Sequence, residues 1–249
     1  MGNLMKSLIK TMLMRAGIRV TRNGHLNRFQ ATEDSLKSIA RRGLSPTVII
    51  DGGANIGSFA RDMRVIFPDA KIHCIEPQPG CREALEKLAG EADGRVIYHP
   101  IALAAPERHG TTMAMTTDDA MQSTGAHLSP ERLEGLMVPL ETLDSRLVTS
   151  LLPSDRVLLK LDLQGYELEA LRGSSETLSK TECIITEVSF YSQAYEPPIS
   201  EIVAFLAGFG FDLYDVAAIY ARPRDNRPRQ GDFIFIHRDA PIARDTAWS

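Results

Sequence analysis

The chain has 249 residues, 43% of them hydrophobic, which is enough apolar material for the core of one sizeable α/β domain. Its formal net charge of −4 at pH 7 argues against nucleic acid as the main partner. Its three cysteines are odd in number and form no CxxC pair, which argues against a disulfide framework or a structural zinc site and favours the cytoplasm.

Residues 1–45 predict a basic, amphipathic helical extension ahead of the main domain. Lys6, Lys10 and Arg15 are interspersed there with leucine, isoleucine and methionine. The apolar runs are too short for a membrane span, and no signal-peptide cleavage pattern closes them. We expect a helix that packs on the domain. Peripheral contact of this helix with an anionic membrane surface is the alternative.

From residue 46 to 239, short apolar runs alternate with helical periods, a pattern that is typical of parallel βαβ units. The predicted strands cover 48–51, 71–76, 95–99, 157–162, 183–188, 211–216 and 232–237. The predicted helices cover 58–67, 80–89, 142–152, 168–178 and 199–209. The link between the last two strands is too short for a helical crossover, so we expect this pair to be antiparallel. The prediction is a doubly wound, mostly parallel sheet of seven strands with the last strand reversed.

Two segments fall outside this alternation. Residues 104–140 are rich in Thr, Ser, Asp and Met and have weak periodicity, which predicts a polar insertion with a short hairpin or a loop over a site. Residues 240–249 form a C-terminal tail.

The stretch "DGGANIG" follows the first predicted strand, which ends at Asp51. Ligands of doubly wound sheets lie outside the carboxyl ends of the strands, and glycines at this position let the backbone approach them closely. The dinucleotide fingerprint Gly-x-Gly-x-x-Gly fits in neither register. The pattern Asp51-x-Gly53-x-Asn55-x-Gly57 instead resembles the first motif of class I S-adenosylmethionine (SAM) methyltransferases.

An acidic residue, Glu76, ends the second predicted strand in "IEPQP", 25 residues after Asp51. A carboxylate at this place can accept hydrogen bonds from both hydroxyls of a ribose. An exposed strand-end carboxylate is the simpler interpretation of Glu76 alone. Together with the glycine loop, the residue predicts a nucleoside site.

A lysine and an aspartate occur inside the predicted strand of "RVLLKLDLQGYELEAL". Side chains alternate across a strand, so Lys160 and Asp162 share one face. A central parallel strand is normally apolar on both faces, and unpaired buried charge is costly. A structural pair of Lys160 with Asp162 or with Glu187 would explain the lysine, whereas Asp162 lies nearer the open end of the strand.

The ordered motifs "DGGANIGSF", "IEPQP", "ETLD", "LLKLDLQGYELEALRG", "IITEVSF" and "GFDLYDV…GDFIFIH" resemble those of FkbM-type methyltransferases, from about residue 46 to 237. The resemblance implies a Rossmann-like methyltransferase fold and SAM as cofactor. It also implies methyl transfer to a hydroxyl oxygen of a small molecule, such as a polyketide, or of a glycan.

These observations lead to a mechanistic hypothesis. Asp162 is the candidate general base, and Lys160 orients it or tunes its pKa. The candidate cofactor-binding residues are Asp51, Gly53, Asn55, Gly57, Glu76 and, in the polar insertion, Ser123. The candidate acceptor-binding residues are Glu167, Glu187, Arg222 and Arg224. No histidine lies near Asp162 and Glu187 in sequence, so we expect no metal at the site.

Two other functions remain as alternatives. One is a nicotinamide-dependent oxidoreductase, against which the failed glycine register and the lack of a Tyr-x-x-x-Lys pair count. The other is a non-catalytic module of methyltransferase fold that binds a partner or a lipid. The sequence leaves the acceptor and the oligomeric state open.

Overall fold

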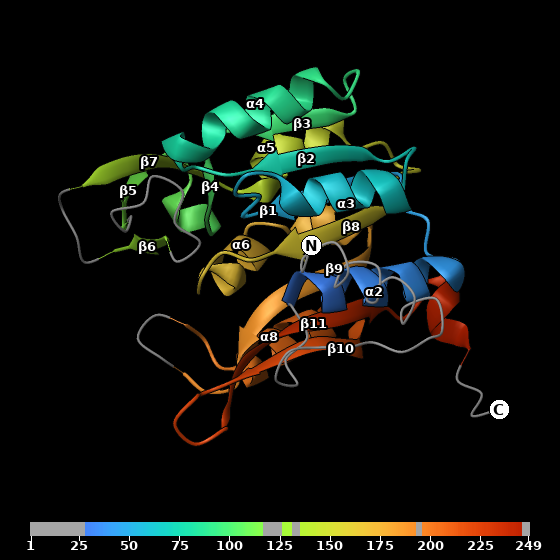
Figure 1. The fold of residues 1–249 in the computed structure, drawn as a ribbon. Coiled ribbons are helices and arrows are strands. Elements are labelled where there is room, and N and C mark those ends of the chain that lie inside the picture. The colour runs from blue at the N-terminus through green and yellow to red at the C-terminus, as the bar shows by residue number, and fades with distance from the viewer. Residues whose placement is uncertain (1–27, 117–125, 131–134, 193–195, 246–249) are drawn as a thin grey trace, which may run out of the picture.

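The computed structural model describes residues 28–116, 126–130, 135–192 and 196–245. Its main sheet has seven strands in the order β10-β11-β9-β8-β1-β2-β3 (Figure 1). These strands are β1 (Val48–Gly52), β2 (Lys71–Ile75), β3 (Val96–His99), β8 (Val157–Leu161), β9 (Thr181–Ser189), β10 (Phe211–Ala221) and β11 (Pro228–His237). Neighbouring strands are parallel except where β11 pairs with β9 and β10. The predicted doubly wound sheet with a reversed last strand is therefore confirmed.

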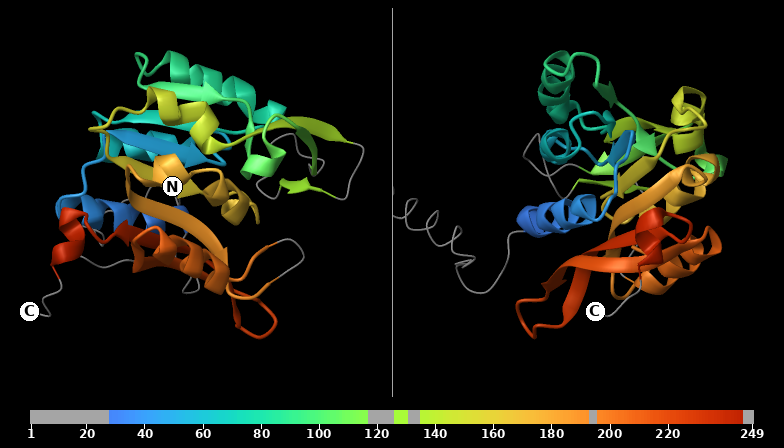
Figure 2. Two further views of the ribbon diagram at one scale, coloured as in Figure 1. Left: turned by 180° about the vertical axis from the view of Figure 1, so that it is seen from behind. Right: turned by 90° about the vertical axis from the view of Figure 1, so that its right-hand side faces the viewer.

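Helices cover both faces of this sheet (Figure 2). On one face lie α2 (Arg28–Arg41), α3 (Ser58–Ile66) and α4 (Arg82–Gly90). On the other lie α5 (Leu143–Leu147), α6 (Glu167–Arg172), α7 (Ser175–Leu178) and α8 (Ile199–Gly208). The central strand β1 is buried along its whole length, as its unbroken run of Val48, Ile49 and Ile50 requires.

The segment 104–140 contributes to a second, four-stranded sheet instead of a simple hairpin. Its strands are β4 (Ala102–Leu103), β5 (Thr112–Thr116), β6 (His127–Ser129) and β7 (Leu136–Glu141), in the order β4-β7-β5-β6. Met113, Met115 and Leu128 are buried in it against Tyr166. The small sheet therefore stands beside the carboxyl edge of the main sheet (Figure 1).

The antiparallel hairpin at the end of the chain is longer than its apolar residues predict. β10 extends to Ala221 and β11 begins at Pro228, so most of the segment predicted as a loop continues the ladder. Three register shifts interrupt the pairing. Such bulges break the regular alternation of apolar and polar residues by which a strand is recognised in sequence.

Two predicted helices are shorter than expected. The segment 168–178 is divided into α6 and α7 at Gly173, where an added Cβ would lie 2.3 Å from the carbonyl oxygen of Ala104. The segment 142–152 begins as α5, with the hydroxyl of Thr142 accepting a hydrogen bond from the Ser145 amide, and ends in a 3₁₀ turn. Packing against the neighbouring small sheet therefore overrides helix periodicity.

Helix α2 is the described part of the predicted extension. Its Leu36 and Ile39 are fully buried against the sheet beside α3 and β10. The basic segment with Lys6, Lys10 and Arg15 lies outside the described residues. Within the described ranges, no helix combines the length and the apolar character that crossing a membrane demands.

Two histidines on adjacent strands form a buried pair. His73 of β2 and His99 of β3 have stacked rings with centroids 5.2 Å apart, and His73 Nδ1 lies 3.0 Å from His99 Nε2. Burial lowers the pKa of each imidazole to about 4, and the proximity of His99 further lowers that of His73. Both rings are therefore neutral near pH 7, and one ring donates the shared hydrogen bond while the other accepts it.

This pair makes stability depend on pH. The folded-state pKa of about 4 lies below the ordinary histidine value of 6.5, so the unfolded chain binds protons more readily. The stabilisation is complete above pH 6.5 and is lost as the pH falls toward 4. In the wild-type protein the free energy of unfolding falls between pH 7 and pH 5. We expect this fall to be smaller in His73→Leu by roughly 1–2 kcal/mol. Urea unfolding at both pH values measures it.

The control is Val65→Leu at an exposed, non-titrating position of α3, which should leave the wild-type decrease unchanged. Equal decreases in wild type and in His73→Leu would show that the pair does not titrate on unfolding.

Candidate active site

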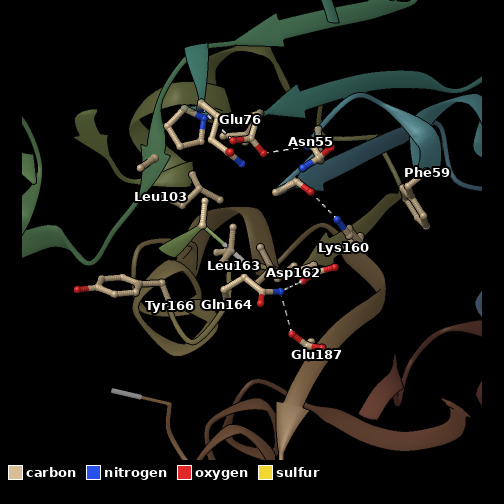
Figure 3. A pocket seen from close by; sticks show the side chains of 18 of the residues that line it. Asn55, Phe59, Glu76, Leu103, Lys160, Asp162, Leu163, Gln164, Tyr166 and Glu187 are labelled. Atoms are coloured by element: carbon tan, nitrogen blue, oxygen red, sulfur yellow. Dashed lines mark hydrogen bonds between the residues drawn. The ribbon is translucent and has the colours of Figure 1, made fainter. Parts of the chain in front are cut away.

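A cavity of about 590 Å³ lies at the carboxyl edge of the main sheet (Figure 3). Its walls come from the glycine loop after β1 and the ends of β2, β8 and β9. Helix α2 at Thr32 and Glu33, strand β11 at Asp232 and the small sheet complete them. This is the edge at which doubly wound sheets bind ligands. Its volume falls in the range of about 300–1,000 Å³ that is usual for small-molecule sites.

Strand periodicity explains why polar residues gather on one side of this cavity. Cys183 and Ile185 of β9 pack toward α2 and α3, and Glu187 continues the same alternation at the carboxyl edge. In β11, Asp232 lies on the same side of the strand as Ile234 and continues its alternation. Asp232 and Glu187 are directly paired across the two strands. Each strand therefore changes from apolar to acidic where it reaches the cavity.

The glycine loop touches the end of β8. Gly53 has φ 74°, and a Cβ there would lie 2.0 Å from the carbonyl oxygen of Asp162. Its amide and that of Ala54 donate to the Ile75 carbonyl at 3.0 and 3.1 Å. Only glycine permits this approach, which brings the loop and Asp162 together at the cavity.

Gly57, by contrast, lies outside the cavity wall. With φ 81° it precedes α3, and a Cβ there would meet Leu88 at 2.7 Å. Its position supports the packing of α3 on α4.

Lys160 joins the two central strands beneath this loop. Its Nζ lies 3.0 Å from Asp51 Oδ1 and donates to the carbonyls of Gly53 and Gly52 at 2.8 and 3.2 Å. Burial raises the pKa of the fully buried Asp51, and the ammonium group opposes that rise. The structure thus pairs Lys160 with Asp51, which does not line the cavity, rather than with the two partners considered from sequence.

Glu76 lines the cavity opposite Asp162 (Figure 3). Its Oε2 accepts a hydrogen bond from the Asn55 amide and its Oε1 one from the Gln78 amide, both at 2.9 Å. Burial raises the pKa of this carboxyl, and the two amides oppose the rise. Each carboxylate oxygen keeps capacity for a second hydrogen bond, so the group can hold a ligand while it is fixed by backbone.

The opposite wall is a chain of carboxylates and amides. Gln164 Nε2 donates to Asp162 Oδ1 at 2.8 Å and to Glu187 Oε2 at 3.2 Å (Figure 3). The amide of Gln230 donates to the other oxygen of Glu187. Thr32 of α2 donates to Asp232 at 3.2 Å. Asp162, Glu187, Gln164, Asp232 and Thr32 all line the cavity.

Glu167 lies beside this wall but does not line the cavity. Its carboxylate accepts hydrogen bonds from the Leu163 and Gly165 amides at 2.6 and 3.0 Å, which closes the turn between β8 and α6. Burial, followed by the nearby Glu187 and Asp162, raises its pKa to about 8. Of the two roles open to it, acceptor binding or capping a turn, the contacts correspond to the cap.

Two other candidate residues are not brought to the cavity. Arg222 forms an ion pair with Asp225 at the tip of the β10–β11 hairpin and stacks on Tyr191. The side chain of Arg224 is 75% exposed. Neither lines the cavity, and Ser123 lies outside the described residues.

Sequence reasoning missed Thr32, Asp232 and the bridging role of Gln164. Thr32 belongs to no motif. Asp232 lies in the motif "GDFIFIH", where the alternation of the strand was the signal that could have identified it. Among the residues that the structure describes, no cluster of three or more His, Cys, Asp or Glu side chains is arranged to hold a metal ion.

Comparisons with known proteins find similar sequences and structures. The methyltransferase FkbM domain model matches residues 51–213. The 2-O-methyltransferase NoeI of Sinorhizobium fredii is 30% identical over 181 residues, which cover 65% of this chain and 72% of that protein. The methyltransferase sdnD of Sordaria araneosa is 26% identical over 194 residues, with 66% and 73% covered.

A solved FkbM methyltransferase from Methylobacillus flagellatus KT is 13% identical, with a TM-score of 0.48. The match covers 78% of this chain and 44% of that one. The family model spans well over half of the chain. The chain therefore belongs to the FkbM methyltransferase family, and the resemblance found in its sequence motifs is confirmed.

The contact of the glycine loop with β8 is directly testable. We expect Gly53→Ala to lower the free energy of unfolding by about 1–3 kcal/mol, because the new methyl group meets the Asp162 carbonyl and φ 74° strains an L-residue. Chemical denaturation measures the change.

Gly208→Ala is the control, since an added Cβ there meets no atom within 4 Å. A Gly53→Ala protein as stable as wild type would contradict the close approach.

Proposed function

We propose that this protein is a SAM-dependent O-methyltransferase that acts on a hydroxyl of a sugar, glycan or polyketide-type natural product. The observation that carries the proposal is the placement of Glu76 and Asp162 on opposite walls of one cavity beside the glycine loop. The first offers a ribose-binding carboxylate and the second a base. Family membership supports methyl transfer, and the printed name of the 2-O-methyltransferase relative supports oxygen as the acceptor atom.

The cavity residues fit SAM. Gly53 presents backbone at a point where a Cβ cannot stand, Asn55 lines the cavity beside it, and Glu76 offers acceptor oxygens to the ribose hydroxyls. Ile101 and Leu103 give an apolar wall for the adenine ring. Lys160, at the cavity wall, and Asp51 and Gly57, behind it, hold the loop and α3 in place.

Bound SAM would supply an electrophilic methyl group on a positively charged sulfur. A hydroxyl is a poor nucleophile, so Asp162 would accept its proton as the oxygen attacks. Glu187 and Asp232 would accept hydrogen bonds from the other hydroxyls of the acceptor, which fixes its orientation. We do not include Arg222 and Arg224 in this site, because they do not line the cavity.

Calorimetric titration with SAM and, separately, with NADH tests the cofactor. We expect SAM to bind and NADH not to bind. Replacing Glu76 by Ala should weaken SAM binding at least about tenfold, because two hydrogen bonds to a charged group are lost. Glu83→Ala, an exposed glutamate of α4, is the matched control. Binding of NADH alone would favour the oxidoreductase, and binding of neither a non-catalytic module.

Catalysis is tested by transfer of a tritiated methyl group from SAM to a panel of sugar and polyketide hydroxyls. We expect Asp162→Asn to reduce turnover by about 10²–10⁴, the usual contribution of a general base. Its dissociation constant for SAM should stay within about twofold of wild type, because the amide keeps the shape of the side chain. Full turnover of this variant would remove Asp162 from the role of base.

A further inference from the structure

Gln164 lies in an unusual backbone conformation at the cavity. Its φ is 53°, in the left-handed region that only a few per cent of non-glycine residues adopt, and Gly165 follows with φ 104°. The buried carboxylate of Glu167 holds this turn by accepting the amides of Leu163 and Gly165. The turn places the Gln164 side chain against the carboxyl ends of β8 and β9 (Figure 3).

The amide group of Gln164 has two N–H bonds, and each has its own carboxylate acceptor. One is Asp162 Oδ1 at 2.8 Å and the other Glu187 Oε2 at 3.2 Å. Two ionised carboxylates that share one donor repel each other, and this repulsion favours protonation of one of them. A hydrogen bond donated to a carboxylate favours its ionised form, so a donor between the two carboxylates opposes that protonation.

Acidic residues from several elements lie near Asp162. Glu187 of β9, Asp232 of β11, Glu33 of α2 and Glu76 after β2 line the same cavity, and Asp51 of β1 and Glu167 of α6 interact electrostatically with Asp162. Lys160 of β8 contacts Asp51 and the glycine loop. A lysine in place of Gln164 would form an ion pair with the Asp162 carboxylate and so oppose its action as a base. A glutamate would add another negative charge.

We propose that Gln164 is a positioning residue for methyl transfer, whose side-chain amide holds the carboxylates of Asp162 and Glu187 together, keeps both ionised and fixes the edge that Asp162 presents to the acceptor. This role rests on the proposed function of Asp162 as base. Gln230 contacts Glu187 but does not line the cavity, so it steadies the second carboxylate only.

Carbon-13 NMR of the side-chain carboxyl groups in the full chain tests the proposal without an acceptor. The Asp162 signal is identified by its absence in Asp162→Asn, and its chemical shift is followed against pH. We expect Gln164→Met, which removes both donors at similar size, to move the midpoint of the Asp162 titration upward by about one pH unit. Gln164→Glu should move it further.

Two further variants control for misfolding and for effects that act through Glu187 alone. Gln164→Gly adopts a positive φ without strain and should give the same upward shift even if the methionine variant does not fold. Gln230→Met removes an amide from Glu187 and none from Asp162, so it should leave the Asp162 midpoint within about 0.3 pH unit of wild type. An unchanged midpoint in folded Gln164→Gly, or an equal shift in Gln230→Met, would overturn the proposal.

The two proposals fail separately. If Asp162→Asn transfers methyl groups normally, Asp162 is not the base, whatever the titration shows. If that variant is inactive and the Gln164 variants titrate like wild type, the base stands and Gln164 does not control it.

Discussion

The buried ion pair of Lys160 with Asp51 is the interaction on which the rest of the site depends. It links the two central strands, β8 and β1, in which these residues are direct neighbours. The same ammonium group donates to the carbonyl of Gly53 and, together with the Asp162 amide, to that of Gly52. Removing one partner of such a pair leaves an isolated buried charge, at a cost of about 3–5 kcal/mol. The pair therefore sets the path of the glycine loop before any ligand arrives.

Backbone contacts of the glycine loop fix the positions of the neighbouring cavity residues. Gly53 lies so close to the Asp162 carbonyl that the glycine loop and the end of β8 cannot move independently. The Asn55 amide then fixes Glu76, and the Glu167 carboxyl group fixes the turn after Asp162. Rigid strand ends thus hold the polar groups of the cavity, while the small sheet of β4–β7 contributes mainly apolar wall.

The wall of carboxylates and amides includes parts of the chain beyond the family region. Thr32 and Asp232 lie outside residues 51–213, the region that matches the family model, yet they meet at one hydrogen bond of 3.2 Å. Helix α2 reaches that position because its apolar residues Leu36 and Ile39 pack against the sheet. This wall therefore combines Asp162, Gln164 and Glu187 of the shared family region with residues from the two ends of the described chain.

The sequence alone determined the seven strands of the main sheet in their chain order, the glycine loop, and Glu76 and Asp162 as acidic residues at strand ends, because each depends on local periodicity or on a short motif. Only the tertiary structure decided that Lys160 pairs with Asp51, that Glu167 caps a turn, and that Arg222 and Arg224 lie away from the cavity. It also joined Gln164 to Glu187 and Thr32 to Asp232. These contacts connect separate strands and a distant helix, so they depend on sheet order, register and packing, which no local pattern encodes.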